Sequence, residues 1–307
     1  MKPVRVVGCY IAAVFIGGSL LAPWLYGSIH SLAPFFPEVA DAPFHRFVSR
    51  SWLALAVAGI WPLLHGLGAR SWLDLGLVKP AGQWRRLGAG FALGFTSLAV
   101  VAILALAAGA RAFNPLHPAL ASKLLSAALT ASVVAVLEEI LFRGGVFGGF
   151  RRVFSWRKAL LLSSLIYALL HFLESARLAG PVLWYSGLEL LPRMMRGFIN
   201  WRHLLPGLFN LAMAGLLLGL AYQRTGNLYF SIGLHAGWIF WLRSYGALTR
   251  PVPGVDPWFW GTSALINGWL ALLALSTLLV LSLNFPRPVP SSPAGLLKPT
   301  YLHIKIR

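Results

Sequence analysis

The segment LLSAALTASVVAVLEEILFRGGVF, residues 124–147, decides the fold class of this chain. An apolar run of this length can cross the hydrocarbon core of a bilayer as a helix, which takes about 20 residues. Three ionisable residues, Glu138, Glu139 and Arg143, lie inside it. Charged side chains within a membrane span are costly and by default indicate a functional site. The segment therefore predicts a membrane-spanning helix that carries polar chemistry.

Seven further apolar runs lie on either side of this segment, at 6–27, 51–69, 87–109, 159–175, 205–222, 228–248 and 262–284. Of the 307 residues, 58% are hydrophobic and 11% are charged, less than half of the ~25% charged residues of a soluble domain. This composition excludes soluble and disordered proteins, and the single cysteine, Cys9, excludes a disulfide framework. We expect an all-α, polytopic transmembrane helical bundle with about eight spanning helices.

The net charge of +18 comes from 26 basic and 8 acidic residues. Most of the basic residues flank apolar runs, where they fix topology and meet anionic lipid headgroups, so membrane lipid rather than nucleic acid is the expected partner. With eight spans, 15 Lys and Arg residues fall on the side of the N-terminus and nine on the other side. This bias predicts a multi-pass membrane protein with both termini in the cytoplasm.

We expect the two adjacent glutamates in residues 124–147 to have different roles. Glu139 and Arg143 are four residues apart, so on a helix they share a face and can form an ion pair. Glu138 lies about 100° further round the helix and is not neutralised by the same contact. Such a carboxylate in an apolar setting is a candidate general base. The alternative is that all three side chains form a buried polar cluster that only locks helices together.

Two histidines in other predicted spans complete the candidate site. His171 lies in the run 159–175, with Tyr167 one helical turn earlier and able to orient the imidazole, and His235 lies in the run 228–248. A lone histidine in an apolar helix is usually a packing residue. Two of them together with Glu138 could hold and deprotonate a water molecule, or could bind a metal ion such as zinc. Spacing does not choose between these chemistries. The six remaining histidines are weaker candidates because they lie in loops, at span ends or in the tail: His30, His45, His65, His117, His203 and His303.

Three motifs in order resemble the CPBP family, which comprises type II CAAX prenyl endopeptidases and related bacterial proteins, some implicated in bacteriocin processing or immunity. The motifs are Glu-Glu-x-x-x-Arg at 138–143, aromatic-x-x-x-His at 167–171 and the histidine at 235. The resemblance covers about residues 120–245. It implies an intramembrane endopeptidase, and a bacterial inner (plasma) membrane as the location.

The resemblance also implies roles for the site residues. Glu138 and His171 would activate the attacking water, and His235 would help to stabilise the oxyanion. Glu139 and Arg143 would be the orienting pair. The family has been described both as metalloproteases and as glutamate-based proteases that require no metal. If a metal is present, Glu138, His171 and His235 are its expected ligands.

Two positions depart from the family pattern. The second motif begins with Tyr167 where phenylalanine is usual, and Ile239 stands where the third motif usually has Asn or Asp. Loss of an oxyanion donor costs about 3–4 kcal/mol in transition-state stabilisation. Either another donor replaces it, such as Asn210 or the indole of Trp238, or the activity is weakened.

The expected substrate is a membrane-anchored or membrane-inserted peptide, not necessarily a prenylated one. Two rival functions remain: a catalytically weak scaffold or bacteriocin-immunity-type protein, which Ile239 favours, and a transporter with a proton relay, for which no inverted repeat is found. The chain divides into N-terminal transmembrane helices (1–119), the catalytic core that resembles the family (120–245), a C-terminal transmembrane helix (246–284) and a basic, Pro-rich tail (285–307).

Overall fold

The structure is a computed structural model that describes residues 2–35, 37–114, 119–173, 176–199 and 201–284. The α-helices are α1 (Lys2–Ala12), α2 (Gly18–Ser31), α3 (Pro37–Ala40), α4 (Phe44–Gly66), α5 (Trp84–Ala107), α6 (Leu120–Glu138), α7 (Gly148–Phe150), α8 (Trp156–Leu169), α9 (Ser186–Met194), α10 (Trp201–Thr225), α11 (Tyr229–Leu248), α12 (Pro257–Trp260) and α13 (Trp269–Asn284). π-Helical segments, Ala13–Gly17 and Glu139–Phe147, join α1 to α2 and α6 to α7, and 3-10 turns span Leu73–Leu75, Met195–Phe198 and Leu265–Asn267. Two short strands, β1 (Arg111–Phe113) and β2 (Thr249–Pro251), pair antiparallel. The predicted tail 285–307 lies outside the described residues.

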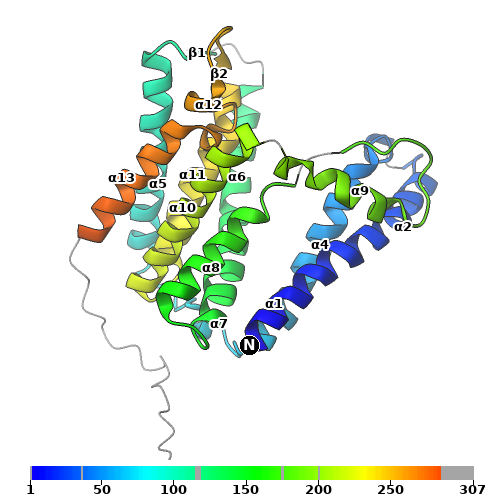
Figure 1. The fold of residues 1–307 in the computed structure, drawn as a ribbon, viewed down its shortest axis with the longest axis horizontal. Coiled ribbons are helices and arrows are strands. Elements are labelled where there is room, and N and C mark those ends of the chain that lie inside the picture. The colour runs from blue at the N-terminus through cyan, green and yellow to red at the C-terminus, as the bar shows by residue number, and fades with distance from the viewer. Residues whose placement is uncertain (1, 36, 115–118, 174–175, 200, 285–307) are drawn as a thin grey trace, which may run out of the picture.

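The all-helical membrane architecture is confirmed. Within the described residues, five helices are long and apolar enough to cross a membrane: Lys2–Ser31, Phe44–Gly66, Trp84–Ala107, Leu120–Phe150 and Leu204–Thr225. The other three predicted runs are helical as α8, α11 and α13. Figure 1 shows successive long helices running alternately toward and away from the N-terminal end. This alternation is the one that eight spans require, although the number of spans stays a prediction.

Helix α11 lies at the centre of the bundle, since 13 of its 20 residues are buried. It packs most extensively on α5 and α6. A Cβ atom added at Gly90 or Gly94 of α5 would collide with backbone atoms of α11, and one added at Gly233 or Gly237 of α11 would collide with backbone atoms of α5. Small residues four apart on both helices thus let the two backbones touch, as in membrane helix pairs generally. His235 is fixed between the two glycines of α11.

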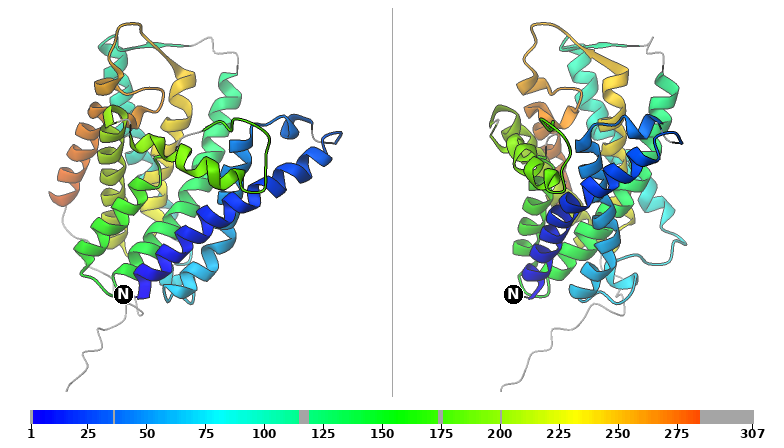
Figure 2. Two further views of the ribbon diagram at one scale, coloured as in Figure 1. Left: turned by 45° about the vertical axis from the view of Figure 1, so that its right-hand side comes forward. Right: turned by 90° about the vertical axis from the view of Figure 1, so that its right-hand side faces the viewer.

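The N-terminal helices form a separate group beside this bundle. Helices α1, α2 and α4 pack on one another, and α9 lies across α2 and α4, as both views of Figure 2 show. Phe47, Val48 and Leu190 are fully or almost fully buried in the core of this group. Helix α9 lies in the long connection between α8 and α10.

The helix that carries the acidic pair changes its winding at that pair. Residues Glu139–Phe147 form a π-helix, in which hydrogen bonds join residues five apart instead of four. π-Helical segments inside α-helices are frequent at functional sites. A Cβ atom at Gly144 or Gly145 would press on Leu75 or Leu64. The glycines therefore let this segment lie close against α4 and the turn that follows it.

Candidate active site

Glu139 and Arg143 form a buried ion pair, as their spacing predicts. Glu139 Oε1 lies 3.0 Å from Arg143 Nη1, and the two side chains are 0% and 3% exposed. The same oxygen lies 3.0 Å from Nδ1 of His235, which comes from α11. A buried carboxylate needs such partners because its desolvation is costly. Glu139 therefore joins the helix of the first motif to the helix of the third.

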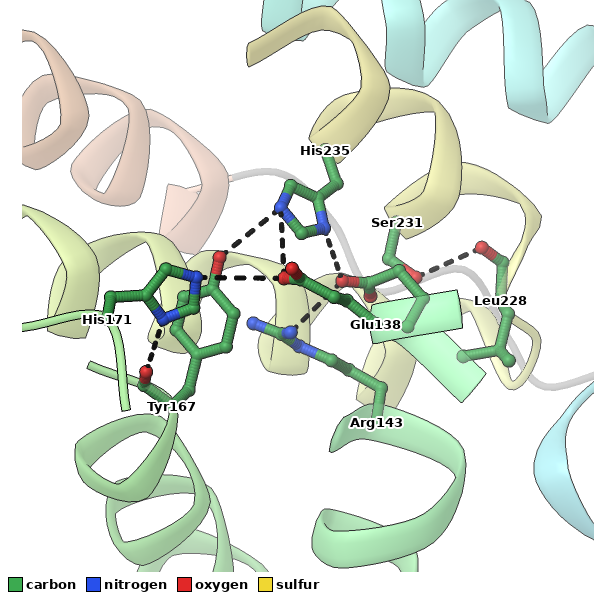
Figure 3. A network of polar contacts seen from close by, with 8 residues as sticks. Glu138, Arg143, Tyr167, His171, Leu228, Ser231 and His235 are labelled. Carbon is green, nitrogen blue, oxygen red and sulfur yellow. Dashed lines mark hydrogen bonds and ion pairs between the residues drawn. The ribbon is translucent and has the colours of Figure 1, made fainter. Parts of the chain in front are cut away.

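Tyr167 packs against this pair from α8. The Arg143 guanidinium carbon lies 4.6 Å from the centre of the Tyr167 ring, a cation–π contact. The Phe142 ring meets the Tyr167 ring edge-on at 5.0 Å. The phenol ring thus has a fixed position against the motif that begins at Glu138. Figure 3 shows Arg143, Tyr167 and His235 converging from three helices.

His171 lies just beyond the end of α8, although the sequence places it inside a span that runs to residue 175. Helix α8 ends at Leu169. The His171 Nδ1–H donates to the carbonyl oxygen of Tyr167 at 2.7 Å, so the side chain takes the acceptor that an α-helical backbone N–H would use. The His171 backbone N–H instead donates to Ala168, three residues back. This local exchange both ends the helix and orients the ring.

Glu138 faces both histidines. Its Oε2 atom lies 3.9 Å from Nε2 of His171 and 3.7 Å from Nε2 of His235. These separations are too long for direct hydrogen bonds, and this buried oxygen has no hydrogen-bond partner among the described residues. Two hydrogen bonds of about 2.8 Å that meet at roughly 90° span about 4 Å. One small oxygen can therefore contact Glu138 and His171 together.

The Tyr167 hydroxyl reaches the second histidine. It lies 3.3 Å from His235 Nε2. Because Glu139 is paired with Arg143, the Nδ1 of His235 serves as the donor to Glu139. In neutral His235, Nε2 then accepts from the Tyr167 hydroxyl. In protonated His235 both ring nitrogens donate, and the hydroxyl is free to donate elsewhere.

The two substitute oxyanion donors suggested by the sequence bond elsewhere. The Asn210 amide donates to the Gly268 carbonyl at 2.9 Å, and the Trp238 indole N–H donates to the Ser97 hydroxyl at 2.9 Å. Ile239 is buried in the apolar cluster that includes Ile232. The hydroxyl beside His235 Nε2 is that of Tyr167, at 3.3 Å, a contact that the sequence does not predict.

Ser231 is a second residue that the sequence analysis overlooks. It lies one helical turn before His235 on α11, near the Glu139 carboxylate (Figure 3). Its hydroxyl donates to the Leu228 carbonyl at 3.0 Å, as Figure 3 shows. The four-residue spacing from Ser231 to His235 is the signal that could have identified it.

Within the described ranges, no group of three or more His, Cys, Asp or Glu side chains is arranged to hold a metal ion. Glu138, His171 and His235 converge, but they do not form such a group.

An apolar pocket of about 230 Å³ adjoins the site on the side of the N-terminal helices. Tyr10 and Trp52 line it from that group, and Leu141 and Leu170 line it from the bundle. Leu141 follows Glu138 by three residues, and Leu170 precedes His171. The Tyr10 hydroxyl and the Trp52 indole donate to backbone carbonyls. The pocket therefore presents apolar surface next to the polar cluster.

Residues 120–241 match the family model described as Type II CAAX prenyl endopeptidase Rce1-like. No curated protein and no solved structure matches the chain. The matched segment contains all three motifs and every residue of the polar cluster. The resemblance read from the motifs is thus confirmed over this part of the chain, and the family implies a protease. Residues 120–241 are therefore similar to the Type II CAAX prenyl endopeptidase Rce1-like family.

Proposed function

We propose that this protein is an intramembrane endopeptidase that hydrolyses a peptide bond in a membrane-associated substrate, with Glu138 as the general base. The observation that carries this proposal is the Glu138 Oε2 atom, which faces the Nε2 atoms of two histidines and has no hydrogen-bond partner among the described residues. A carboxylate oxygen that faces two histidines and has no fixed donor is suited to taking a proton from water.

The reaction begins with a water molecule bound between Glu138 and His171. Because His171 Nδ1–H is engaged by the Tyr167 carbonyl, Nε2 of the neutral ring accepts one hydrogen of this water. Glu138 removes the other proton while the water oxygen attacks the scissile carbonyl carbon. Glu138 then delivers that proton to the amide nitrogen as the C–N bond breaks, which leaves a carboxylic acid and an amine.

The negative oxygen of the tetrahedral intermediate is held by Tyr167 and His235. The Tyr167 hydroxyl lies 3.3 Å from His235 Nε2, so both groups can reach one oxygen. Protonated His235 donates from Nε2 while Glu139 holds its Nδ1–H. This arrangement supplies the hydrogen bonds that Ile239 cannot make, and it supports catalysis over the scaffold alternative.

The apolar pocket supports a substrate that approaches from the lipid. Its walls are side chains of the N-terminal helices and of the bundle, and it lies next to the residues that flank Glu138 and His171. A membrane-anchored or membrane-inserted peptide could place an apolar segment there while its scissile bond reaches the polar cluster.

Purified protein tests the proposal with a library of membrane-anchored peptides. We expect Glu138→Gln to cleave at least ~100-fold more slowly than wild type, the lower end of the range for a lost general base. Glu189→Gln, at a glutamate on α9 that is 40% exposed, is the matched control and should cleave normally. Normal cleavage by Glu138→Gln would refute the mechanism. Loss of wild-type cleavage on addition of a chelator, with recovery on zinc, would show that the metal-free chemistry is wrong.

A further inference from the structure

A second cavity, of about 420 Å³, lies far from the polar cluster. The β1–β2 ribbon, the end of α11 and the loop around α12 bound it. Figure 1 shows this region at the end of the molecule opposite the N-terminus. Its lining includes Arg111, Thr249, Thr262 and Ser263. The family match begins at residue 120 and ends at 241, so these four residues lie outside it.

Arg111 is the charged group of this cavity, and its side chain is almost completely buried. The residue is 6% exposed. Its Nε and Nη2 groups donate to the Thr249 hydroxyl at 3.1 and 3.0 Å, and Nη2 also donates to the Thr249 carbonyl at 3.2 Å. The guanidinium carbon lies 5.0 Å from the centre of the Tyr245 ring. These contacts fix the guanidinium in one orientation.

Among the described residues, no carboxylate forms an ion pair with Arg111. Its bonds to Thr249 use Nε and Nη2 and leave Nη1 for another partner. A buried cation without an anion is costly, and the guanidinium fork matches phosphate oxygens well. The cavity thus combines space with an unbalanced, oriented cation.

The surroundings favour an anion at the lipid interface. Arg250 is exposed on β2, where it pairs with Ala112 of β1. Trp258 and Trp260 lie on α12 and are partly exposed, and tryptophan side chains gather at the level of lipid headgroups. The nearby acid, Asp256, is exposed and accepts a hydrogen bond from the Trp258 backbone N–H.

We propose that the cavity around Arg111 binds a phosphate group, as carried by the headgroup of an anionic phospholipid. The phosphate oxygens accept hydrogen bonds from the free edge of the Arg111 guanidinium, and the hydroxyl of Ser263 is a further donor in the lining. The acyl chains leave the cavity along the partly exposed tryptophan side chains.

The test uses full-length protein in detergent and measures retained lipid by native mass spectrometry and thermal stability in parallel. The probes are phosphatidylglycerol, zwitterionic phosphatidylcholine with the same chains, and inorganic phosphate. Arg111→Gln removes the cation. Ser263→Asp keeps Arg111 and its packing but adds a carboxylate to the lining. Arg250→Gln is the matched control, because it removes an exposed arginine from the neighbouring strand.

Wild type and Arg250→Gln should bind phosphatidylglycerol in preference to phosphatidylcholine and gain thermal stability from it. Both other variants should bind it about tenfold to a hundredfold more weakly, as expected for a lost charge-assisted hydrogen bond. Equal stabilisation of wild type by inorganic phosphate, lost in Arg111→Gln, would keep the phosphate site and identify free phosphate as its source. Unchanged lipid preference in Arg111→Gln and Ser263→Asp would overturn the proposal, since a purely structural arginine alters stability and not lipid preference.

Discussion

Two buried arginines among the described residues, Arg143 and Arg111, have similar surroundings and different partners. Each lies over a tyrosine ring, Tyr167 at 4.6 Å and Tyr245 at 5.0 Å. Each is nearly buried, at 3% and 6% exposed. Arg143 pairs with the carboxylate of Glu139, whereas Arg111 bonds only the hydroxyl and carbonyl of Thr249.

The difference lies in whether a buried arginine has an anionic partner within the protein. Arg143 neutralises one of two adjacent carboxylates, so Glu139 becomes part of the architecture and Glu138 is left without a fixed cation. Arg111 has no carboxylate of its own among the described residues, and we therefore assign it an external anion. Arg143 is structural because its anionic partner, Glu139, lies within the protein. Arg111 has no such partner among the described residues, so we propose that it is available to a ligand.

Removal of Arg143 should have the largest effect on stability. Arg143→Leu leaves the Glu139 carboxylate buried without its cation, and breaking a buried pair in this way costs about 3–5 kcal/mol. Unfolding in mixed detergent micelles, followed by helical circular dichroism, measures the loss. A cost no larger than that of Arg111→Gln would mean that Glu139 has other compensation and that the contrast between the two arginines is wrong.

Removal of the Tyr167 hydroxyl should reduce the rate more than the stability. Tyr167→Phe keeps the ring against Arg143 and Phe142 but deletes the oxyanion donor, and loss of such a donor lowers kcat about 10²- to 10³-fold. Tyr229→Phe, which loses a hydroxyl bond to the Val78 carbonyl, is the control that should keep its kcat. Steady-state cleavage kinetics decide the matter, and a normal kcat for Tyr167→Phe would remove this residue from the mechanism.

Arg111→Gln should destabilise the protein less than Arg143→Leu. It deletes the hydrogen bonds that Arg111 donates to Thr249, but it leaves no carboxylate unpaired. The same micelle unfolding measurement applies. A loss of stability as large as that of Arg143→Leu would indicate that Arg111 also has an anionic partner within the protein. The contrast between the two arginines would then be weaker.

The exposed ion pair on α9 should contribute least to the free energy of unfolding. Arg193 and Glu189 are 34% and 40% exposed and four residues apart, and such pairs contribute about 0.5 kcal/mol or less. Arg193→Ala should therefore shift the unfolding midpoint very little. A shift comparable with that of Arg111→Gln would show that the unfolding assay does not distinguish buried from exposed interactions.

Much of this site could be predicted from the sequence because its signals are local. The Glu139–Arg143 pair follows from a four-residue spacing, and the convergence of Glu138, His171 and His235 follows from three ordered motifs. The close packing of α5 on α11 is also readable, in the paired sequences GFALG at 90–94 and GLHAG at 233–237. The ion pair and the glycine spacing depend on helical periodicity, and the convergence depends on the resemblance of the three motifs to a family.

The rest depends on contacts between helices. The Tyr167 hydroxyl reaches His235 because α8 packs on Glu139–Phe147 and α11 packs on α6. The sequence therefore assigns Tyr167 to His171 and seeks an oxyanion donor at Asn210 or Trp238. The end of α8 at Leu169 depends on a side-chain bond to the Tyr167 carbonyl. Arg111 meets Thr249 across 138 residues of sequence, a distance that no local pattern spans.

The two adjacent glutamates provide the most direct test of the account, with cleavage and unfolding measured on the same purified samples. We predict that Glu138→Gln unfolds close to wild type and cleaves at least ~100-fold more slowly. We predict that Glu139→Gln lowers the free energy of unfolding by about 3–5 kcal/mol. A Glu138→Gln variant that is as unstable as Glu139→Gln, or that cleaves normally, would contradict the division of one carboxylate for structure and one for chemistry.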